Sequence, residues 1–168
     1  MNKKNLYALR IAQGGIIAAL YVALTLLFAP ISFGEVQLRI AEMLTILPMF
    51  TPAAIPGLFV GCLIGNVLGG AVLPDIIFGS LATLIGAVFS WMLRKHRWLV
   101  PIPAVVSNTL IIPFVLKYAY GIELPIILLM LYIFVGEVLG CYVLGELLAF
   151  PLMKMRKIFN PGGGSGGT

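Results

Sequence analysis

The sequence has few charged residues, and this scarcity indicates the class of protein. Only 10% of its 168 residues are Asp, Glu, Lys or Arg, whereas 61% are hydrophobic. A water-soluble domain usually carries roughly 25% charged residues. The polar surface is too small to cover a soluble globule of this length, so we expect an integral membrane protein.

Residue sets typical of enzymes and metal centres are also missing from the sequence. It has one His and two Cys, and Cys62 and Cys141 lie in separate apolar segments without metal-ligand spacing. A Walker-type phosphate loop, a nucleophile elbow and a Ser-His-acid set are absent. We therefore predict a protein that is not an enzyme and has no resident metal or cofactor, with both thiols buried as small hydrophobic groups.

The basic residues that are present gather in three clusters between long apolar runs. Such clusters mark the cytoplasmic ends of membrane spans. Nucleic-acid binding is not expected, because the basic residues flank apolar runs instead of covering one face. The clusters are Lys3, Lys4 and Arg10; Arg94, Lys95 and Arg97; and Lys154, Arg156 and Lys157.

Six apolar segments are predicted to be helical spans. They cover about 11–28, 39–50, 53–72, 74–93, 99–116 and 124–150. A span needs about 20 residues, so the second is short and the sixth is long. Six crossings place every basic cluster on the same side of the membrane. We predict an all-α fold, a single six-helix transmembrane domain over 1–160 with both termini cytoplasmic, and interpret 161–168 as a linker or cleavage scar.

Glu35, Arg39 and Glu42 form the densest polar motif outside the basic clusters. Their spacing of i, i+4 and i+7 predicts one face of a helix, on which they can pair. They lie at the outer entrance of the second segment. Either Arg39 lies at the membrane interface beside an acid, or the three residues line a polar pocket open to the outside.

Further polar residues lie within or beside the apolar segments. Glu137 has no basic residue three or four positions away, so it must be protonated, meet a partner from another helix or face a polar cavity. Asp75 either stabilises a helix N-terminus or binds a ligand. Asn108 either bonds to a neighbouring helix or contacts a ligand. Glu146 is expected to meet basic groups at the inner end, and Tyr120 is interpreted as an interfacial residue.

Small residues recur every fourth position in two of the segments. Such stripes allow a second helix to approach closely. For the stripe in the third segment we predict packing within the bundle. The stripe in the first segment is suited either to packing in the bundle or to docking of another subunit. The stripes are Gly57, Gly61, Gly65 and Gly69, and Gly15, Ala19 and Ala23.

A charge-poor bundle with a few convergent polar groups is typical of a solute-binding membrane protein. The sequence resembles the substrate-binding S components of energy-coupling factor (ECF) transporters, and within them the QueT type. The resemblance rests on FGEVQLRIAEMLTILPMFTPAAIPGLFVGCLIGN at 33–66, DIIFGSLATLIGA at 75–87, Asn108, and VGEVLGCYVLGE at 135–146. It extends from the first span to about Lys157.

This resemblance implies a six-helix protein of the bacterial cytoplasmic membrane that captures a solute from outside. The small residues Ala19 and Ala23 would dock on a shared membrane T component, which works with two ATPase subunits to release the solute inside. Members of the QueT type are associated with queuosine precursors, which are deazaguanine bases.

The polar residues are compatible with such a ligand. Carboxylates such as Glu137, Asp75 or Glu42 can accept N–H groups of a guanine-like edge, and the Asn108 amide can serve a carbonyl or ring nitrogen. Which acid contacts which edge stays open at this point. Three alternatives remain: an S component for another vitamin, a proton-coupled secondary transporter using Glu137 and Glu146, and a purely structural membrane partner.

Overall fold

The computed structural model describes residues 3–32 and 39–154, and its regular elements there are all helical. Glu35 lies outside the described residues. The short elements η1 and η2 are 3₁₀ helices and η3 is a π-helix. In order, the elements are α1 (Lys3–Leu27), α2 (Ala29–Ser32), η1 (Ile40–Met49), α3 (Ala54–Leu68), α4 (Leu73–Met92), η2 (Arg97–Leu99), α5 (Ile102–Tyr118), α6 (Ile126–Glu137), η3 (Val138–Leu144) and α7 (Gly145–Lys154).

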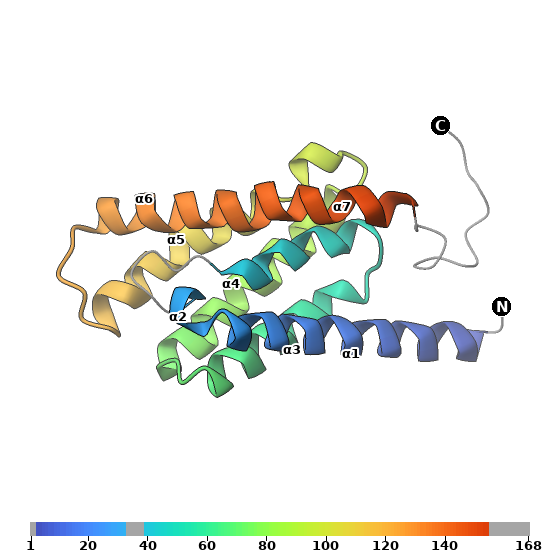
Figure 1. Ribbon diagram of the computed structural model, residues 1–168, viewed down its shortest axis with the longest axis horizontal. Helices are drawn as coiled ribbons and strands as arrows, with labels where there is room; N and C mark the ends of the chain where they lie inside the picture. Colours follow the sequence, from blue (N-terminus) through green and yellow to red (C-terminus); the bar gives the residue numbers. More distant parts are fainter. Residues whose placement is uncertain (1–2, 33–38, 155–168) are drawn as a thin grey trace.

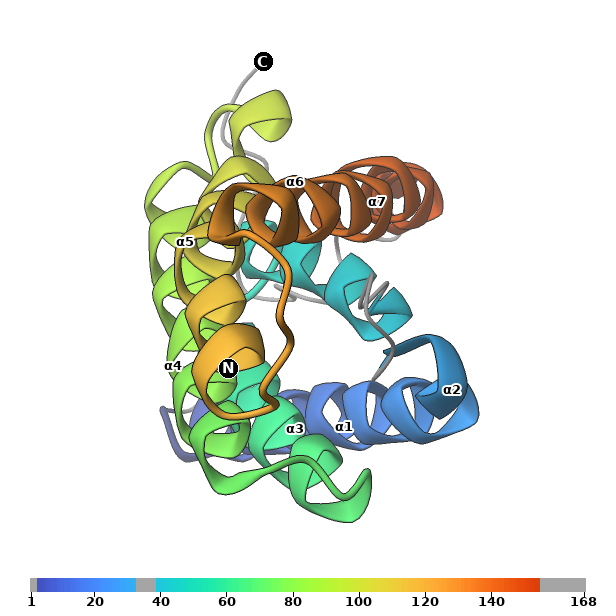
Figure 2. The same cartoon turned by 90° about the vertical axis from the view of Figure 1, so that its left-hand side faces the viewer.

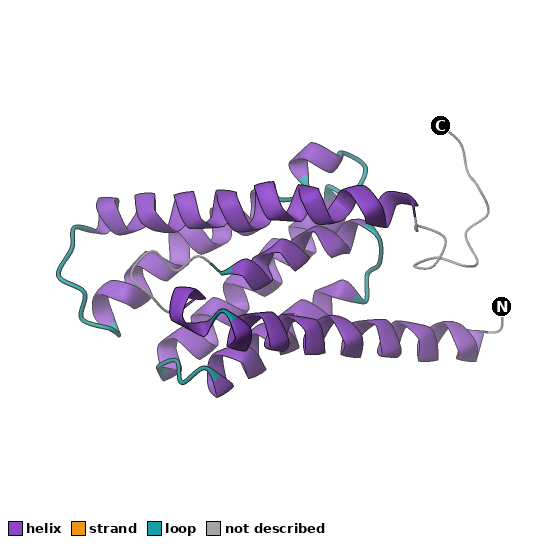
Figure 3. Cartoon of the chain, viewed as in Figure 1, coloured by secondary structure: helices purple, strands orange, loops and turns teal. Residues whose placement is uncertain are grey.

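The helices form an elongated bundle with a shared long axis (Figure 1). The start of α1, the η2 turn and the end of α7 lie at the same end of the bundle. Short loops join the helices elsewhere (Figure 3). Seen along the axis, α1 and α3 form one side, α4 and α5 a second, and α6 and α7 a third, with η1 between them (Figure 2). Since η1 contacts α1, α3, α4, η3 and α7, it is the central element of the fold.

Each predicted apolar segment coincides with a helix or a continuous helical run. Four runs are long and apolar enough to cross a membrane: Lys3–Leu27, Leu73–Met92, Arg97–Tyr118 and Ile126–Lys154. The other two, η1 and α3, have 10 and 15 residues. At about 2.0 and 1.5 Å per residue they span only about 20 Å, less than the roughly 30 Å hydrocarbon layer.

The distribution of exposed side chains is the reverse of that in a soluble protein. Ile127, for example, is 79% exposed, whereas the ionisable residues Arg39, Glu42, Asp75 and Glu137 are all buried. Water would favour the opposite arrangement, because burying a charge without compensation is very costly. An apolar exterior around a polar interior is expected of a bundle surrounded by lipid.

The glycine stripe of α3 packs directly against α1. A Cβ atom added to Gly57 would lie 2.7 Å from the backbone oxygen of Gly14, and one added to Gly61 would lie 2.7 Å from the Cβ of Tyr21. Distances this short leave no room for any side chain at these two positions. The prediction that the third segment packs within the bundle is therefore confirmed.

The small residues of α1 lie on the opposite face of that helix. Gly15, Ala19 and Ala23 are exposed, whereas Ile17 and Tyr21 are buried toward α3 and the core. A Cβ added to Gly15 would meet no atom within 4 Å. This outer face of α1 is thus left uncovered by the described part of the chain.

Candidate functional site

A cluster of buried polar side chains surrounds η1, and we call it the polar cluster. It contains five of the residues that the sequence singled out: Arg39, Glu42, Asp75, Asn108 and Glu137. None is more than 6% exposed. They come from four parts of the chain, the η1 region, α4, α5 and the end of α6, which the fold brings together at its centre.

Arg39 and Asp75 form the ion pair of this cluster. The Nη2 atom of Arg39 donates to both carboxylate oxygens of Asp75, at 3.0 and 3.2 Å. The hydroxyl of Tyr120 donates to Asp75 Oδ2 at 2.9 Å, and the Asn66 amide lies 3.4 Å from the Asp75 backbone oxygen. Both oxygens of the Asp75 side chain therefore already have strong partners within the protein.

The prediction that Arg39 and Glu42 pair along one helical face is wrong. Arg39 precedes η1 and has an extended backbone, with φ −83° and ψ 93°. The helix that follows is also a 3₁₀ helix, so the spacing of an α-helical face does not apply there. Arg39 instead reaches the start of α4, where Asp75 follows Pro74.

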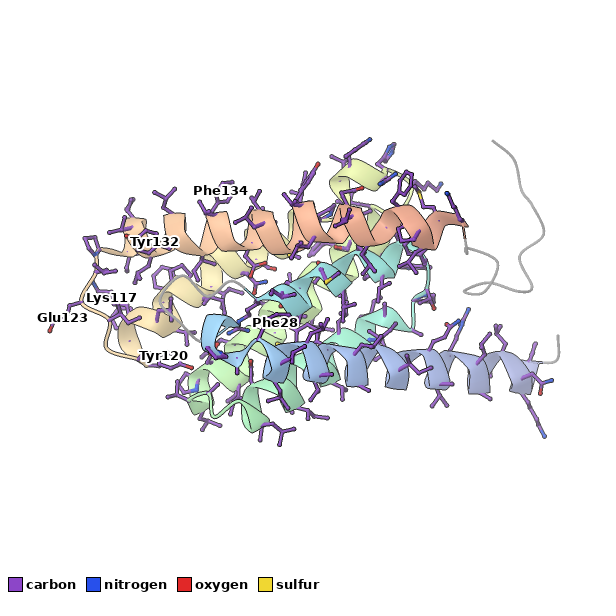
Figure 4. The ribbon with its side chains drawn as sticks, viewed as in Figure 1. Phe28, Lys117, Tyr120, Glu123, Tyr132 and Phe134 are labelled. Atoms are coloured by element: carbon purple, nitrogen blue, oxygen red, sulfur yellow. The ribbon has the colours of Figure 1, made fainter. Side chains whose placement is uncertain are left out.

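Tyr120 lies just after α5, at the end of the bundle opposite the start of α1, near the labelled Lys117 and Glu123 (Figure 4). It is 36% exposed, so its ring reaches the surface while its hydroxyl contacts Asp75. Burial, and then the neighbouring Asp75 carboxylate, raise the pKa of Tyr120 to about 12. The interpretation of Tyr120 as a simple interfacial residue missed this polar contact.

Glu42 projects from η1 with one carboxyl oxygen paired and the other free. Its Oε1 atom accepts hydrogen bonds from the hydroxyls of Tyr21 and of Thr83, the latter at 3.3 Å. Its Oε2 atom is buried and has no hydrogen-bond partner among residues 3–32 and 39–154. An unsatisfied buried acceptor of this kind typically costs about 1–3 kcal/mol.

Glu137 lies beside Glu42 at the junction of α6 and η3. Its Oε2 atom accepts a hydrogen bond from the Cys141 thiol at 3.0 Å. One ligand atom from each of Glu42, Glu137 and Cys141 lies within 4.8 Å of the other two. Two buried carboxyl groups at this separation favour a positively charged group or a proton between them. The π-helical turn at Cys141 is itself a feature often found at functional sites.

Asn108 contributes an unpaired amide from α5. The side chain is 2% exposed and lies close to the carboxyl group of Glu137. Its Nδ2 atom is outside hydrogen-bonding geometry with every described neighbour. The cluster therefore presents a free acceptor on Glu42 and a free donor on Asn108.

The charges of the polar cluster do not balance. Within the described part of the chain, the buried Arg, Lys, Asp and Glu side chains are one cation, Arg39, and three carboxyl groups, Glu42, Asp75 and Glu137. When all are ionised the sum is −2, and Asp75 already engages Arg39. The remaining negative potential is concentrated on Glu42 and Glu137, so a bound cation would be favoured there.

Glu146 and the surface grooves lie apart from this cluster. Glu146 pairs with Arg97 at 2.6 Å, which confirms the prediction that it meets a residue of the basic clusters. Grooves of about 530, 480 and 460 Å³ open on the outside of the bundle, and none of them is lined by residues of the polar cluster.

Several members of the site were not predicted from sequence. They are Tyr21, Thr83 and Cys141, which contact the acids. The signal in the sequence was that each is a polar or thiol side chain within an apolar span. The spacing of residues along one helix does not show which acid on another helix such a side chain contacts. Tyr21 and Thr83 are 21 and 41 residues from Glu42 along the chain, so only the fold identifies the contacts.

Comparison with known proteins gives two matches. The model of a family described as "QueT transporter" matches residues 11–154. The chain is 40% identical over 72 residues to a protein of Lactococcus lactis subsp. cremoris named "Queuosine precursor transporter QueT". That alignment covers 42% of this chain and 42% of the relative, so it spans less than half of the relative's length. No solved structure matches the chain.

Proposed function

Because the chain belongs to the QueT transporter family, we propose that it binds a queuosine precursor, a deazaguanine base, and carries it across the bacterial cytoplasmic membrane. The observation that carries this proposal is the pair of unpartnered buried groups, Glu42 Oε2 and Asn108 Nδ2. A deazaguanine offers N–H donors, on its guanine-like edge or on an aminomethyl substituent, for the first and a carbonyl oxygen for the second. Such a ligand would satisfy both atoms at once.

The contacts of the cluster suggest different roles for its acids. Glu42 and Glu137 have free capacity and excess negative charge, so they are the proposed contacts to N–H groups or to a ligand ammonium. Asp75 is engaged by Arg39 and Tyr120, and its proposed role is to hold the Arg39 side chain. Glu35 remains a predicted contact residue outside the described part of the chain.

Ligand entry requires the cluster to open. Glu42, Asn108 and Glu137 are 1%, 2% and 4% exposed, so a planar base reaches them only after neighbouring helices separate. Binding that depends on such a change is slower than ordinary association at about 10⁵–10⁷ M⁻¹s⁻¹. We expect a slow association rate for the isolated protein.

The proposed transporter architecture is that of an ECF S component with six spans and cytoplasmic termini. The shared position of the start of α1, η2 and the end of α7 supports this, because each carries basic residues. The uncovered stripe of Gly15, Ala19 and Ala23 is the proposed docking face for a T component that acts with two ATPases.

Calorimetry on the purified chain in detergent tests the substrate. The panel contains aminomethyl and nitrile deazaguanines, queuine, guanine and a set of vitamins. We expect tight binding of deazaguanines and weak binding of guanine. A vitamin as the tight ligand would discard the proposed substrate while leaving a solute-binding role.

Glu137→Gln tests the proposed acid contacts. A hydrogen bond to a charged group contributes about 1.5–3 kcal/mol, so the variant should lose roughly 10- to 150-fold in affinity for the aminomethyl ligand. The nitrile ligand, which is neutral, should lose less. Glu146→Gln, an acid outside the cluster, is the matched control. Equal losses for both ligands would assign Glu137 to a structural role or to an edge that both ligands share.

Ala19→Leu tests the docking face. The substitution adds bulk to the uncovered face of α1, so uptake by cells with the T component and ATPases should be lost while ligand binding to the isolated protein is retained. Loss of binding as well would refute the assignment. Uptake into vesicles that lack the partner subunits would instead favour a secondary transporter.

A further inference from the structure

Tyr21 connects α1 to the polar cluster. It is 1% exposed, and its hydroxyl donates a hydrogen bond to Oε1 of Glu42 on η1. The base of this side chain is fixed, because Gly61 of α3 leaves no free space beside the Tyr21 Cβ atom. The Thr25 hydroxyl also bonds to the Tyr21 backbone oxygen, at 2.9 Å.

The Tyr21 hydroxyl restricts the orientation of the Glu42 carboxyl group. The Thr83 hydroxyl of α4 lies 3.3 Å from the same Oε1 atom, but its single proton has a nearer acceptor in the Gly79 backbone oxygen at 3.1 Å. The Tyr21 hydroxyl is therefore the donor that sets the direction of Oε1, and with it the plane of the carboxyl group. Oε2 is the oxygen left without a partner.

This arrangement separates the tasks of the two oxygens. Oε1 is committed to the protein, so the direction of Oε2 is set before a ligand contacts it. Preorganised acceptors bind more strongly than mobile ones, because the ordering cost has already been met during folding. Phenylalanine at position 21 would keep the ring but release Oε1.

We propose that Tyr21 is a positioning residue that determines ligand specificity: it holds Glu42 so that Oε2 is directed toward the cationic group of the ligand. The inference rests on the proposed function and identifies a residue on α1 that acts on the ligand only through Glu42. A ligand without a cationic group makes less use of Oε2, so it depends less on Tyr21.

Calorimetry with the full chain and two probes, aminomethyl deazaguanine and nitrile deazaguanine, tests this. Tyr21→Phe should weaken binding of the aminomethyl probe about tenfold or more and that of the nitrile probe less than threefold, because one charge-assisted contact is misdirected. Tyr7→Phe, on the same helix and 66% exposed, is the matched control and should change neither affinity.

A double-mutant cycle separates positioning from general destabilisation. If Tyr21 acts through Glu42, then Tyr21→Phe should cause no further loss of affinity in a Glu42→Gln background. Additive losses, or equal losses for both probes, would overturn the inference while the proposed function stands. If the unmodified protein bound neither probe, the proposed function would fail and this inference with it.

Discussion

Removing the carboxylate of Asp75 should destabilise the protein far more than removing that of Glu146. In both cases a Glu or Asp side chain pairs with an Arg, but the surroundings differ. The side chains of Arg39 and Asp75 are 6% and 0% exposed, whereas those of Arg97 and Glu146 are 27% and 13% exposed. Asp75→Asn removes the carboxylate charge that Arg39 contacts through both oxygens, at a position shielded from solvent.

The expected size of the effect follows from this burial. Breaking a buried ion pair by removing one partner costs about 3–5 kcal/mol. A partly exposed pair contributes about 0–1 kcal/mol. With about 2–4 °C of Tm per kcal/mol for a chain of this size, Asp75→Asn should lower Tm by about 6–20 °C and Glu146→Gln by at most about 4 °C.

Thermal unfolding in detergent, followed by near-ultraviolet circular dichroism, measures both shifts under identical conditions. The double variant Arg39→Met with Asp75→Leu tests the cause, because it removes the Arg39 charge together with that of Asp75. It should be more stable than Asp75→Asn alone, since apolar replacement of a whole buried pair is often neutral. Equal Tm values for Asp75→Asn and Glu146→Gln would refute the reasoning.

Three other features lead to separate expectations. Gly61→Ala should cost about 1–3 kcal/mol of stability, because its Cβ would lie 2.7 Å from an α1 atom and overpack the α1–α3 contact. Gly15→Ala should be tolerated, since its Cβ would meet no atom within 4 Å. Thermal unfolding of both variants measures the difference. The raised pKa of Tyr120 contributes stability that is complete below pH 10 and is lost as pH rises toward about 12; Tyr120→Phe should abolish this share in an alkaline unfolding series. Cys62 and Cys141 are free and 0% exposed, so a maleimide reagent should label them only after denaturation, and rapid labelling of the native protein would contradict their burial.

The helical class and the positions of the helices could be predicted from sequence, because they depend on local apolar runs. The packing of Gly57 and Gly61 was predictable for the same reason: a stripe of small residues needs only helical periodicity. The helix types were not. A 3₁₀ helix at Ile40–Met49 depends on its neighbours on several sides, which no local pattern reveals.

The candidate site was predictable as a set of residues but not as a set of contacts. Glu42, Asp75, Asn108 and Glu137 stood out because each is a polar group beside or within an apolar segment, and all four are buried near η1. The contact of Arg39 with Asp75 was not predicted, because spacing along a helix does not apply where the backbone is extended. Pairing across the bundle is a property of the tertiary fold.

The π-helix η3 changes the rotation of α7 relative to α6 about the helix axis. The orientation of α7 therefore depends on the number of residues in this stretch. Glu137 and Glu146 are nine residues apart, about two and a half turns of an α-helix, which would place them on opposite sides. The wider turns of η3 use more residues per revolution, and both acids face the bundle, one beside Glu42 and the other against Arg97. Deleting a single residue from this stretch would turn α7 by about 100° relative to α6. The number of residues between the two acids is therefore as strictly required as their identity.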